Sequence, residues 1–391
     1  MPIKSELRES ETHWQEVLKK ECKIPFEFNS RPAIRFILVQ SPSESDLIIL
    51  CHHIICDGMS LAYLARDIML YLGDPACEVE VLPPPVPMDL NNIPGGVGLN
   101  GLAKMFIKRV NRKWDTHRIH FDMEDYQTIC EAYWEKFNHG MITLELSDSE
   151  TSLLVDNCRR EKVTVNSALT AAFIGALYII LSDEFHDTRV TIAGNVRDRL
   201  PVSAGEAMGF FAGGVPLKYK YDIDSSFWDN ARRFHKKAVP SFTDKNLLKE
   251  LIPWLYLDAS ILEAFNFKKI GAIVSARYPR YQKLFGFSRR EDVVSALLKR
   301  SNLDTFDKTV MGTAVTNLTR LDFPKTYGAL ELERLIMYPG GAFPLVNVNL
   351  VVGAVTCSGK LSLILEYAEE KIGPEAMNRI KEKALDFLLL S

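Results

Sequence analysis

The feature that most restricts how this chain can fold is an apolar run at residues 168–181, which contains no charged side chain. A helix needs about 20 apolar residues to cross a bilayer, so the run is too short for that role. It is also too apolar for a protein surface, and we expect a helix buried in a core. With 391 residues and 47% hydrophobic content, the chain can bury one large core or two medium ones.

Strand-like and helix-like segments alternate irregularly along the chain, which predicts a mixed α+β fold. Residues 34–39 and 47–51 have strand patterns, and the second strand is apolar on both faces, so it should lie inside a sheet. Residues 74–101, rich in proline and glycine, form the clearest linker. Further strands are expected at 141–146, 190–194, 215–220, 313–317, 330–338, 345–355 and 361–366. Helices are expected at 58–73, 102–114, 147–160, 167–182, 225–238, 243–268, 291–300 and 374–390.

The overall charge and the cysteines restrict the class of protein. A net charge of −3 argues against nucleic acid as a partner, because binding to a phosphate backbone needs a basic excess. Residues 1–6 contain no apolar run of the kind found in signal peptides, and no transmembrane segment is expected. The seven cysteines are odd in number and scattered, without the spacing of a disulfide framework. We therefore expect a cytoplasmic location.

The segment most suggestive of chemistry is residues 51–58, which read CHHIICDG at the end of the second expected strand. Neighbouring strand residues point to opposite faces, so one of His52 and His53 can enter a cleft while the other packs into the core. Asp57 lies where it can fix a turn, Gly58 suits a helix entry, and Ser60 is expected to cap the helix. Two ordinary structural histidines are the alternative interpretation of the pair.

A metal site is a further alternative for this segment, since Cys51, His52, His53, Cys56 and Asp57 are all ligand types. Adjacent strand positions diverge, however, and no second motif completes a tetrahedral set. We therefore expect no bound metal.

The segment resembles the His-His-x-x-x-Asp-Gly signature of the superfamily that includes peptide-synthetase condensation domains, chloramphenicol acetyltransferase, alcohol acetyltransferases and polyketide-associated acyltransferases. Four further segments are similar to that family and occur in the family's order. They are RPAIR at 31–35, VTVNSAL at 163–169, GNVRDR at 194–199 followed by GFF at 209–211, and TNL at 316–318 with the strands that follow it. The resemblance covers nearly the whole chain.

The resemblance implies two chloramphenicol acetyltransferase-like subdomains, with mixed sheets covered by helices and an active-site tunnel between them. We expect the N-terminal subdomain at residues 1–140 and the C-terminal subdomain at 141–391. His53 comes early for the family's leading strand–helix–strand unit, which indicates a shortened unit. The Asp-Phe-Gly-Trp-Gly motif of the plant branch is absent from the sequence.

The same resemblance implies roles for individual residues. His53 would be the general base, while His52 and Gly58 would be structural. Asp57 would also be structural and paired with an arginine of the second subdomain, for which Arg197 is the first choice and Arg199 the second. A solvated loop pair is the alternative for both arginines. Candidate donors to a developing oxyanion are Thr316 and Asn317, although both residue types are also common in turns.

These roles imply an acyltransferase that moves an acyl group from a thioester donor to an alcohol or amine acceptor, without a bound cofactor. The donor would be acyl-CoA or a phosphopantetheine thioester on an acyl carrier protein. The chain contains no recognisable carrier domain, which favours an acyltransferase with a diffusible donor. The alternatives are a peptide-synthetase-type condensation enzyme, which forms an amide from carrier-bound substrates, and a non-catalytic carrier-docking scaffold. Lys104, Lys108 and Arg112 share one face of an expected helix, where they would contact phosphates or a carrier protein, or form a solvated face.

Overall fold

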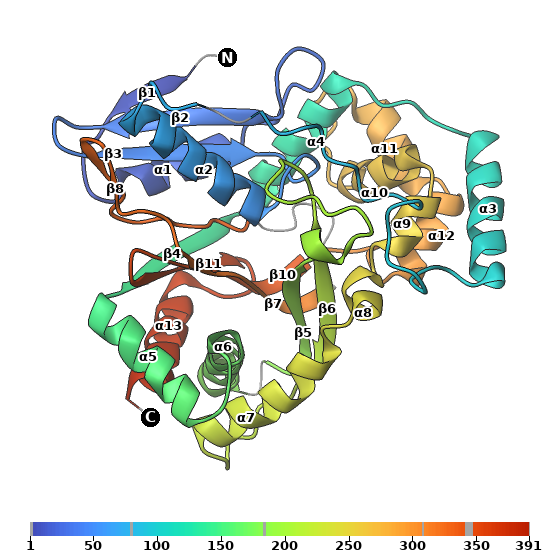
Figure 1. Ribbon diagram of the computed structural model, residues 1–391. Helices are drawn as coiled ribbons and strands as arrows, with labels where there is room; N and C mark the ends of the chain where they lie inside the picture. The colour runs from blue at the N-terminus through green and yellow to red at the C-terminus, as the bar shows by residue number, and fades with distance from the viewer. Residues whose placement is uncertain (1–2, 79–80, 183–184, 307–308, 341–346, 391) are drawn as a thin grey trace.

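The fold consists of two layered parts, seen in a computed structural model that describes residues 3–78, 81–182, 185–306, 309–340 and 347–390 (Figure 1). A three-stranded sheet with two helices forms the N-terminal part, and a six-stranded sheet covered by helices forms the C-terminal part. This arrangement confirms the predicted mixed fold with two subdomains. The boundary at residue 140 stays a prediction.

The N-terminal sheet positions the CHHIICDG segment. β1 (Lys4–Leu7) pairs parallel with β2 (Ile34–Gln40), β2 pairs antiparallel with β3 (Ser45–Cys51), and α1 (His13–Cys22) connects β1 to β2. The sequence indicated a shortened leading unit, yet strand, helix and strand are all present ahead of β3. The four residues of β1 are mostly exposed and carry two charges, so no apolar pattern identified the strand.

The C-terminal sheet has the strand order β4-β11-β10-β7-β5-β6. Parallel pairing joins β10 to β7 and β7 to β5, and the other neighbours are antiparallel, so the sheet is mixed. Its strands are β4 (His139–Leu146), β5 (Arg189–Asn195), β6 (Ala212–Lys218), β7 (Thr309–Leu321), β10 (Asn347–Cys357) and β11 (Lys360–Ala368). The strand predicted at 345–355 begins at Asn347, and residues 345 and 346 lie outside the described residues.

Helices cover one face of this sheet. They are α5 (Asp148–Arg160), α6 (Val165–Leu181), α7 (Phe227–Ala238) and α13 (Pro374–Leu389). Every residue of α6 from Ser167 to Leu177 is buried, as the apolar run predicted. Among the described residues, no single helix is long and apolar enough to cross a membrane.

The opposite face of the sheet contacts the N-terminal part. Trp14, Val17 and Leu18 of α1 pack with residues of β2 and β3 and with Met141 and Ile364 of the large sheet. A smaller cluster joins Ala62 of α2 (Gly58–Gly73) to Leu321 of β7 and Val355 of β10. The helix that follows the CHHIICDG segment is therefore anchored on the C-terminal sheet.

A separate helical region packs around a second core at one side of the molecule (Figure 1). Its helices are α3 (Gly101–Asp115), α4 (Met123–Lys136), α10 (Ala259–Gly271), α11 (Tyr281–Arg289) and α12 (Val293–Arg300). Two short helices, α8 (Asp244–Leu248) and α9 (Ile252–Tyr256), pack in another cluster beside β6. The single helix predicted at 243–268 is wrong, because it is divided into α8, α9 and α10. Pro253 lies in the first turn of α9, and Asp258 caps α10 by accepting from the Ser260 N–H.

A short hairpin reaches from the C-terminal part to α2. It consists of β8 (Thr326–Tyr327) and β9 (Leu330–Glu331), so the long strand predicted at 330–338 is wrong beyond its first two residues. The remainder of that segment follows the wall of a cavity. The backbones of Gly73, at the end of α2, and Gly328, in the hairpin turn, touch so closely that a β-carbon at Gly73 would lie 2.6 Å from the carbonyl oxygen of Tyr327.

Candidate active site

The turn between β3 and α2 holds the two histidines. The Ile55 N–H donates to the carbonyl oxygen of His52 at 3.1 Å, which reverses the chain direction. Asp57 then caps α2, because its extended backbone lets Oδ1 accept from the Ser60 N–H at 2.8 Å. The prediction that Ser60 is the cap is therefore wrong, since a carboxylate three residues earlier already has the geometry of the cap.

One hydrogen bond fixes the tautomer of His53. Its Nδ1 lies 2.7 Å from the carbonyl oxygen of Cys56. Because a carbonyl oxygen only accepts, Nδ1 must carry the proton, and the neutral ring has its lone pair on Nε2. The ring is exposed to the cavity and meets Phe210 edge to face, with centroids 4.9 Å apart.

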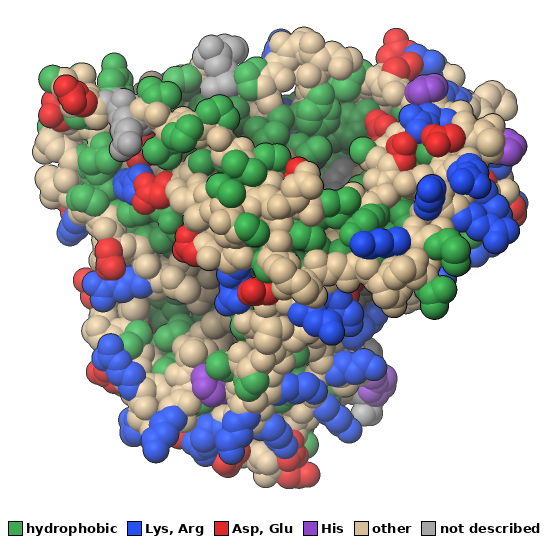
Figure 2. Space-filling view, turned by 45° about the vertical axis from the view of Figure 1, so that its right-hand side comes forward, with side chains coloured by type: hydrophobic (Ala, Val, Ile, Leu, Met, Phe, Trp, Pro, Cys, Tyr) green, Lys and Arg blue, Asp and Glu red, His purple; other side chains and the backbone are tan. Residues whose placement is uncertain are grey.

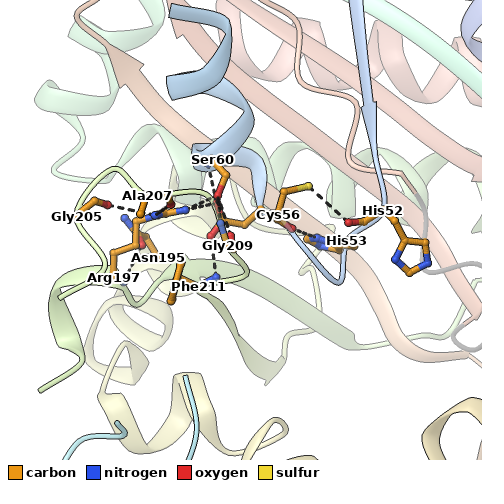
Figure 3. A network of polar contacts seen from close by, with 11 residues as sticks. His52, His53, Cys56, Ser60, Asn195, Arg197, Gly205, Ala207, Gly209 and Phe211 are labelled. Carbon is orange, nitrogen blue, oxygen red and sulfur yellow. Dashed lines mark hydrogen bonds and ion pairs between the residues drawn. The ribbon is translucent and has the colours of Figure 1, made fainter. Parts of the chain in front are cut away.

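His52 points away from His53, as strand alternation predicted (Figure 3). Its ring packs edge to face against Phe26 and Phe28, at centroid distances of 5.8 and 5.0 Å, and its Nδ1 accepts from the Ile54 N–H at 3.3 Å. Burial, with a smaller contribution from His53, lowers the pKa of His52. This histidine is therefore held neutral among aromatic side chains.

Asp57 and Arg197 form a buried ion pair behind the turn. Arg197 Nη2 donates to Asp57 Oδ1 at 2.8 Å and to Ser60 Oγ at 2.6 Å, and the two charged residues are 1% and 5% exposed. The second carboxylate oxygen of Asp57 accepts from the Phe211 N–H at 2.8 Å. Arg197 Nη1 also donates to the carbonyl oxygens of Gly205 and Ala207 at 3.1 and 2.7 Å.

This network connects three segments that are far apart in the sequence (Figure 3). They are the start of α2, the short turn Arg197–Arg199, and the loop 205–211 that leads into β6. Since Asp57 holds the backbone of Phe211, it also fixes the neighbouring Phe210, which contacts the ring of His53. Arg199, the second-choice partner, instead pairs with Asp244 at 2.7 Å on the surface.

His53 lines a cavity of about 3030 Å³ between the two parts. Its walls come from β3, α2, β5, β6, β7 and the extended segment after β9. Figure 2 shows a hollow lined with hydrophobic side chains in the upper half of one face of the molecule. The cavity is larger than the roughly 300–1,000 Å³ of common small-molecule sites, and the exposed His53 ring lies at its wall.

Gly58, Thr316 and Asn317 also line this cavity. Gly58 lies against β7, where an added β-carbon would come 2.8 Å from Cδ2 of Leu318. Asn317 Oδ1 accepts from the Thr319 N–H at 2.7 Å, so this side chain shapes the local turn. The role of Thr316 and Asn317 as oxyanion donors stays a prediction.

The three basic residues predicted to contact phosphates or a carrier protein lie on α3, away from the cavity. Lys104, Lys108 and Arg112 are exposed on α3, and none of them lines the cavity. The Lys104 ammonium lies 5.5 Å from the centre of the Tyr256 ring. Figure 2, which brings this side forward, shows lysine and arginine side chains gathered here.

No group of three or more His, Cys, Asp or Glu side chains within the described parts of the chain could hold a metal ion. The sequence assigned no role to Phe210 or the Cys56 carbonyl, and it placed the Ser60 hydroxyl at a helix cap rather than beside Arg197. The GFF segment was the available signal for Phe210, whereas the other two contacts depend on backbone geometry that no motif encodes.

Comparisons with known proteins identify the fold. A family model described as "Condensation domain" matches residues 2–74, which include β1 to α2 and the histidine turn. The solved structure of the first condensation domain of the CDA synthetase has a TM-score of 0.55 and 13% identity, covering 100% of this chain and 74% of that one. The chain therefore has the two-subdomain fold of condensation domains, and the resemblance seen in its motifs is confirmed.

The chain is also similar to two further proteins. Polyketide synthase associated protein 5 from Mycobacterium tuberculosis has a TM-score of 0.52 and 14% identity, covering 98% of this chain and 80% of that one. Nonribosomal peptide synthetase kk1B from Curvularia clavata is 20% identical over 352 residues, which is 88% of this chain. The chain spans only 2% of the length of that synthetase.

Proposed function

We propose that this chain is a condensation-type acyltransferase in which His53 is the general base. The observation that carries the proposal is the 2.7 Å contact between His53 Nδ1 and the Cys56 carbonyl, which leaves the basic Nε2 available at the cavity. A neutral imidazole is suited to proton transfer near neutral pH, and a positioned base is worth about 10²–10⁴ in rate.

The reaction follows from this geometry. Nε2 takes the proton of an amine or hydroxyl acceptor as that group attacks the thioester carbonyl carbon. The carbon–sulfur bond then breaks, and the imidazolium returns the proton to the leaving thiolate. The Cys56 carbonyl stabilises the imidazolium through the Nδ1 proton, while the Asp57–Arg197 pair positions the turn without moving protons.

The source of the acyl group is inferred from the comparisons. The sequence favoured a diffusible donor such as acyl-CoA, but the condensation-domain match and the peptide-synthetase relative support a donor bound to a carrier protein. We therefore infer a phosphopantetheine thioester as donor and an amine or hydroxyl as acceptor, so that the product is an amide or an ester.

Product analysis tests this function. The purified chain is supplied with acyl groups on carrier protein, on pantetheine and on coenzyme A, together with amine and hydroxyl acceptors, and products are identified by mass spectrometry. His53→Ala should lower turnover by at least about 10²-fold without changing the melting temperature. The matched control is His120→Ala, at an exposed histidine outside the cavity lining.

Two results would contradict the proposal. Turnover of His53→Ala within about tenfold of the parent chain would exclude His53 as the base. Binding of an acyl-carrier protein without turnover of any donor would instead identify a non-catalytic docking scaffold.

A further inference from the structure

Two thiols lie on either side of the histidine turn. Cys51 is the last residue of β3, and Cys56 is the residue whose carbonyl holds His53. The Sγ atoms of both cysteines lie 3.7 Å from the same acceptor, the carbonyl oxygen of His52. Both residues line the cavity; Cys51 is half-buried, so a small reagent that enters the cavity can reach it, whereas Cys56 is buried behind it.

The two thiols, which share this acceptor, also affect each other's protonation. The neighbouring Cys56 thiol lowers the pKa of Cys51, and the neighbouring Cys51 thiol raises the pKa of Cys56. Cys22, Cys130 and Cys158 differ from Cys51, because burial raises the pKa of each of these three thiols to about 12. The thiolate is the reactive form of cysteine, so the half-buried Cys51 is better suited to attack an oxidant than these three thiols.

From this geometry we propose that Cys51 and Cys56 form a dithiol site that a hydroperoxide oxidises to a disulfide. The Cys51 thiolate attacks the peroxide, the O–O bond breaks, and Cys51 becomes a sulfenic acid as water or an alcohol leaves. Cys56 then attacks the Cys51 sulfur, the S–O bond breaks, and the second oxygen leaves as water with the Cys56 proton. Two thiols lose two electrons, and the peroxide gains them.

The disulfide has a consequence for His53, and this part of the inference rests on the proposed function. Bonding to Cys51 draws the Cys56 side chain toward β3 and reorients the residue that supplies the acceptor carbonyl. The 2.7 Å contact to His53 Nδ1 is then lost, and the imidazole is no longer held with its basic nitrogen toward the cavity. Oxidation should therefore stop acyl transfer, and a dithiol reductant should restore it.

Peptide mapping tests the site. Both cysteines lie on one tryptic peptide, residues 36–66, whereas Cys77 lies on the next, residues 67–104. The reduced full chain is treated with hydrogen peroxide at micromolar protein concentration, quenched with N-ethylmaleimide and digested. The peptide 36–66 should lose two hydrogens and carry no maleimide, without any intermolecular link. Because the two groups share one chain, this disulfide should exceed intermolecular Cys77 disulfides by about 10³-fold.

Two cysteine variants test whether the disulfide joins Cys51 to Cys56. Cys77→Ser should still form the disulfide, whereas Cys51→Ser should not form it and should keep its own untreated activity after peroxide. The proposed site is wrong if peptide 36–66 keeps two maleimides under conditions that oxidise Cys77. A disulfide without loss of turnover would overturn the proposed effect on His53. If the reduced chain shows no acyl transfer, the proposed function fails, and the peptide masses still decide the dithiol site.

Discussion

Replacing Asp57 with asparagine tests whether this residue holds the site together or takes part in the chemistry. The substitution keeps the shape of the side chain and removes its charge. Oδ1 accepts from Arg197 Nη2 and from the Ser60 N–H, and Oδ2 accepts from the Phe211 N–H. An asparagine amide therefore turns its NH₂ group toward a hydrogen-bond donor in either orientation, and Arg197 is left with an uncompensated charge.

The loss in the free energy of unfolding follows from the burial of the pair and from the partners that Arg197 keeps. Breaking a buried ion pair commonly costs about 3–5 kcal/mol. Arg197 keeps three acceptors, the carbonyl oxygens of Gly205 and Ala207 and the Ser60 hydroxyl, so the lower end applies. A loss of about 3 kcal/mol corresponds to a decrease in melting temperature of roughly 4 °C for a chain of 391 residues.

Thermal and urea unfolding of the variant measure this loss. Asp67→Asn is the matched control, because Asp67 is paired with Arg66 on the surface and should change stability by less than about 1 kcal/mol. Adding Arg197→Met to Asp57→Asn removes the unpaired charge and should restore part of the stability. If Asp57→Asn melts like the parent chain but is inactive, the structural role is wrong and Asp57 belongs in the catalytic step.

Three further predictions concern metal, acid and the basic helix. Prolonged chelation should leave activity intact, and one zinc per chain that is required for activity would refute the proposed mechanism. Burial lowers the pKa of His52, so the neutral His52 ring stabilises the fold fully above about pH 6.5, and this stabilisation is lost as the pH falls below that value. Between pH 7.5 and 5.5, the free energy of unfolding in urea should therefore fall less for His52→Asn than for the parent chain. Lys108→Gln with Arg112→Gln should not change KM for a pantetheine donor, and a rise confined to carrier-bound donors would identify α3 as a carrier contact.

The sequence predicted the buried elements better than the exposed ones. β2, β3 and α6 have apolar patterns dictated by burial, and their predicted bounds lie within two residues of the observed ones. The exposed β1 has no such pattern. The segment 330–338 has a strand pattern but pairs only at Leu330–Glu331, because pairing depends on which strand edge lies beside it.

The site could be predicted as far as its motif residues. The sequence predicted that His52 and His53 point apart, although β3 ends at Cys51 and the turn, rather than strand alternation, separates them. The family resemblance named Arg197 as the partner of Asp57, a pair that the structure contains. The tautomer of His53 could not be predicted, since it depends on the direction of one carbonyl in the turn. The contact with Phe210 brings together residues more than 150 positions apart, and only the folded chain determines it.

The touching backbones of Gly73 and Gly328 restrict how this fold can diverge. A β-carbon at either position would collide with backbone atoms of the other segment, and Gly328 has a φ of +59° that L side chains rarely adopt. A single substitution at either site therefore forces the hairpin away from α2, and no change at the other site can compensate. Homologues that keep this hairpin should retain glycine at both positions, whereas those that lose one glycine should be free to vary the other. The pair would then appear in an alignment as two coupled positions from opposite subdomains.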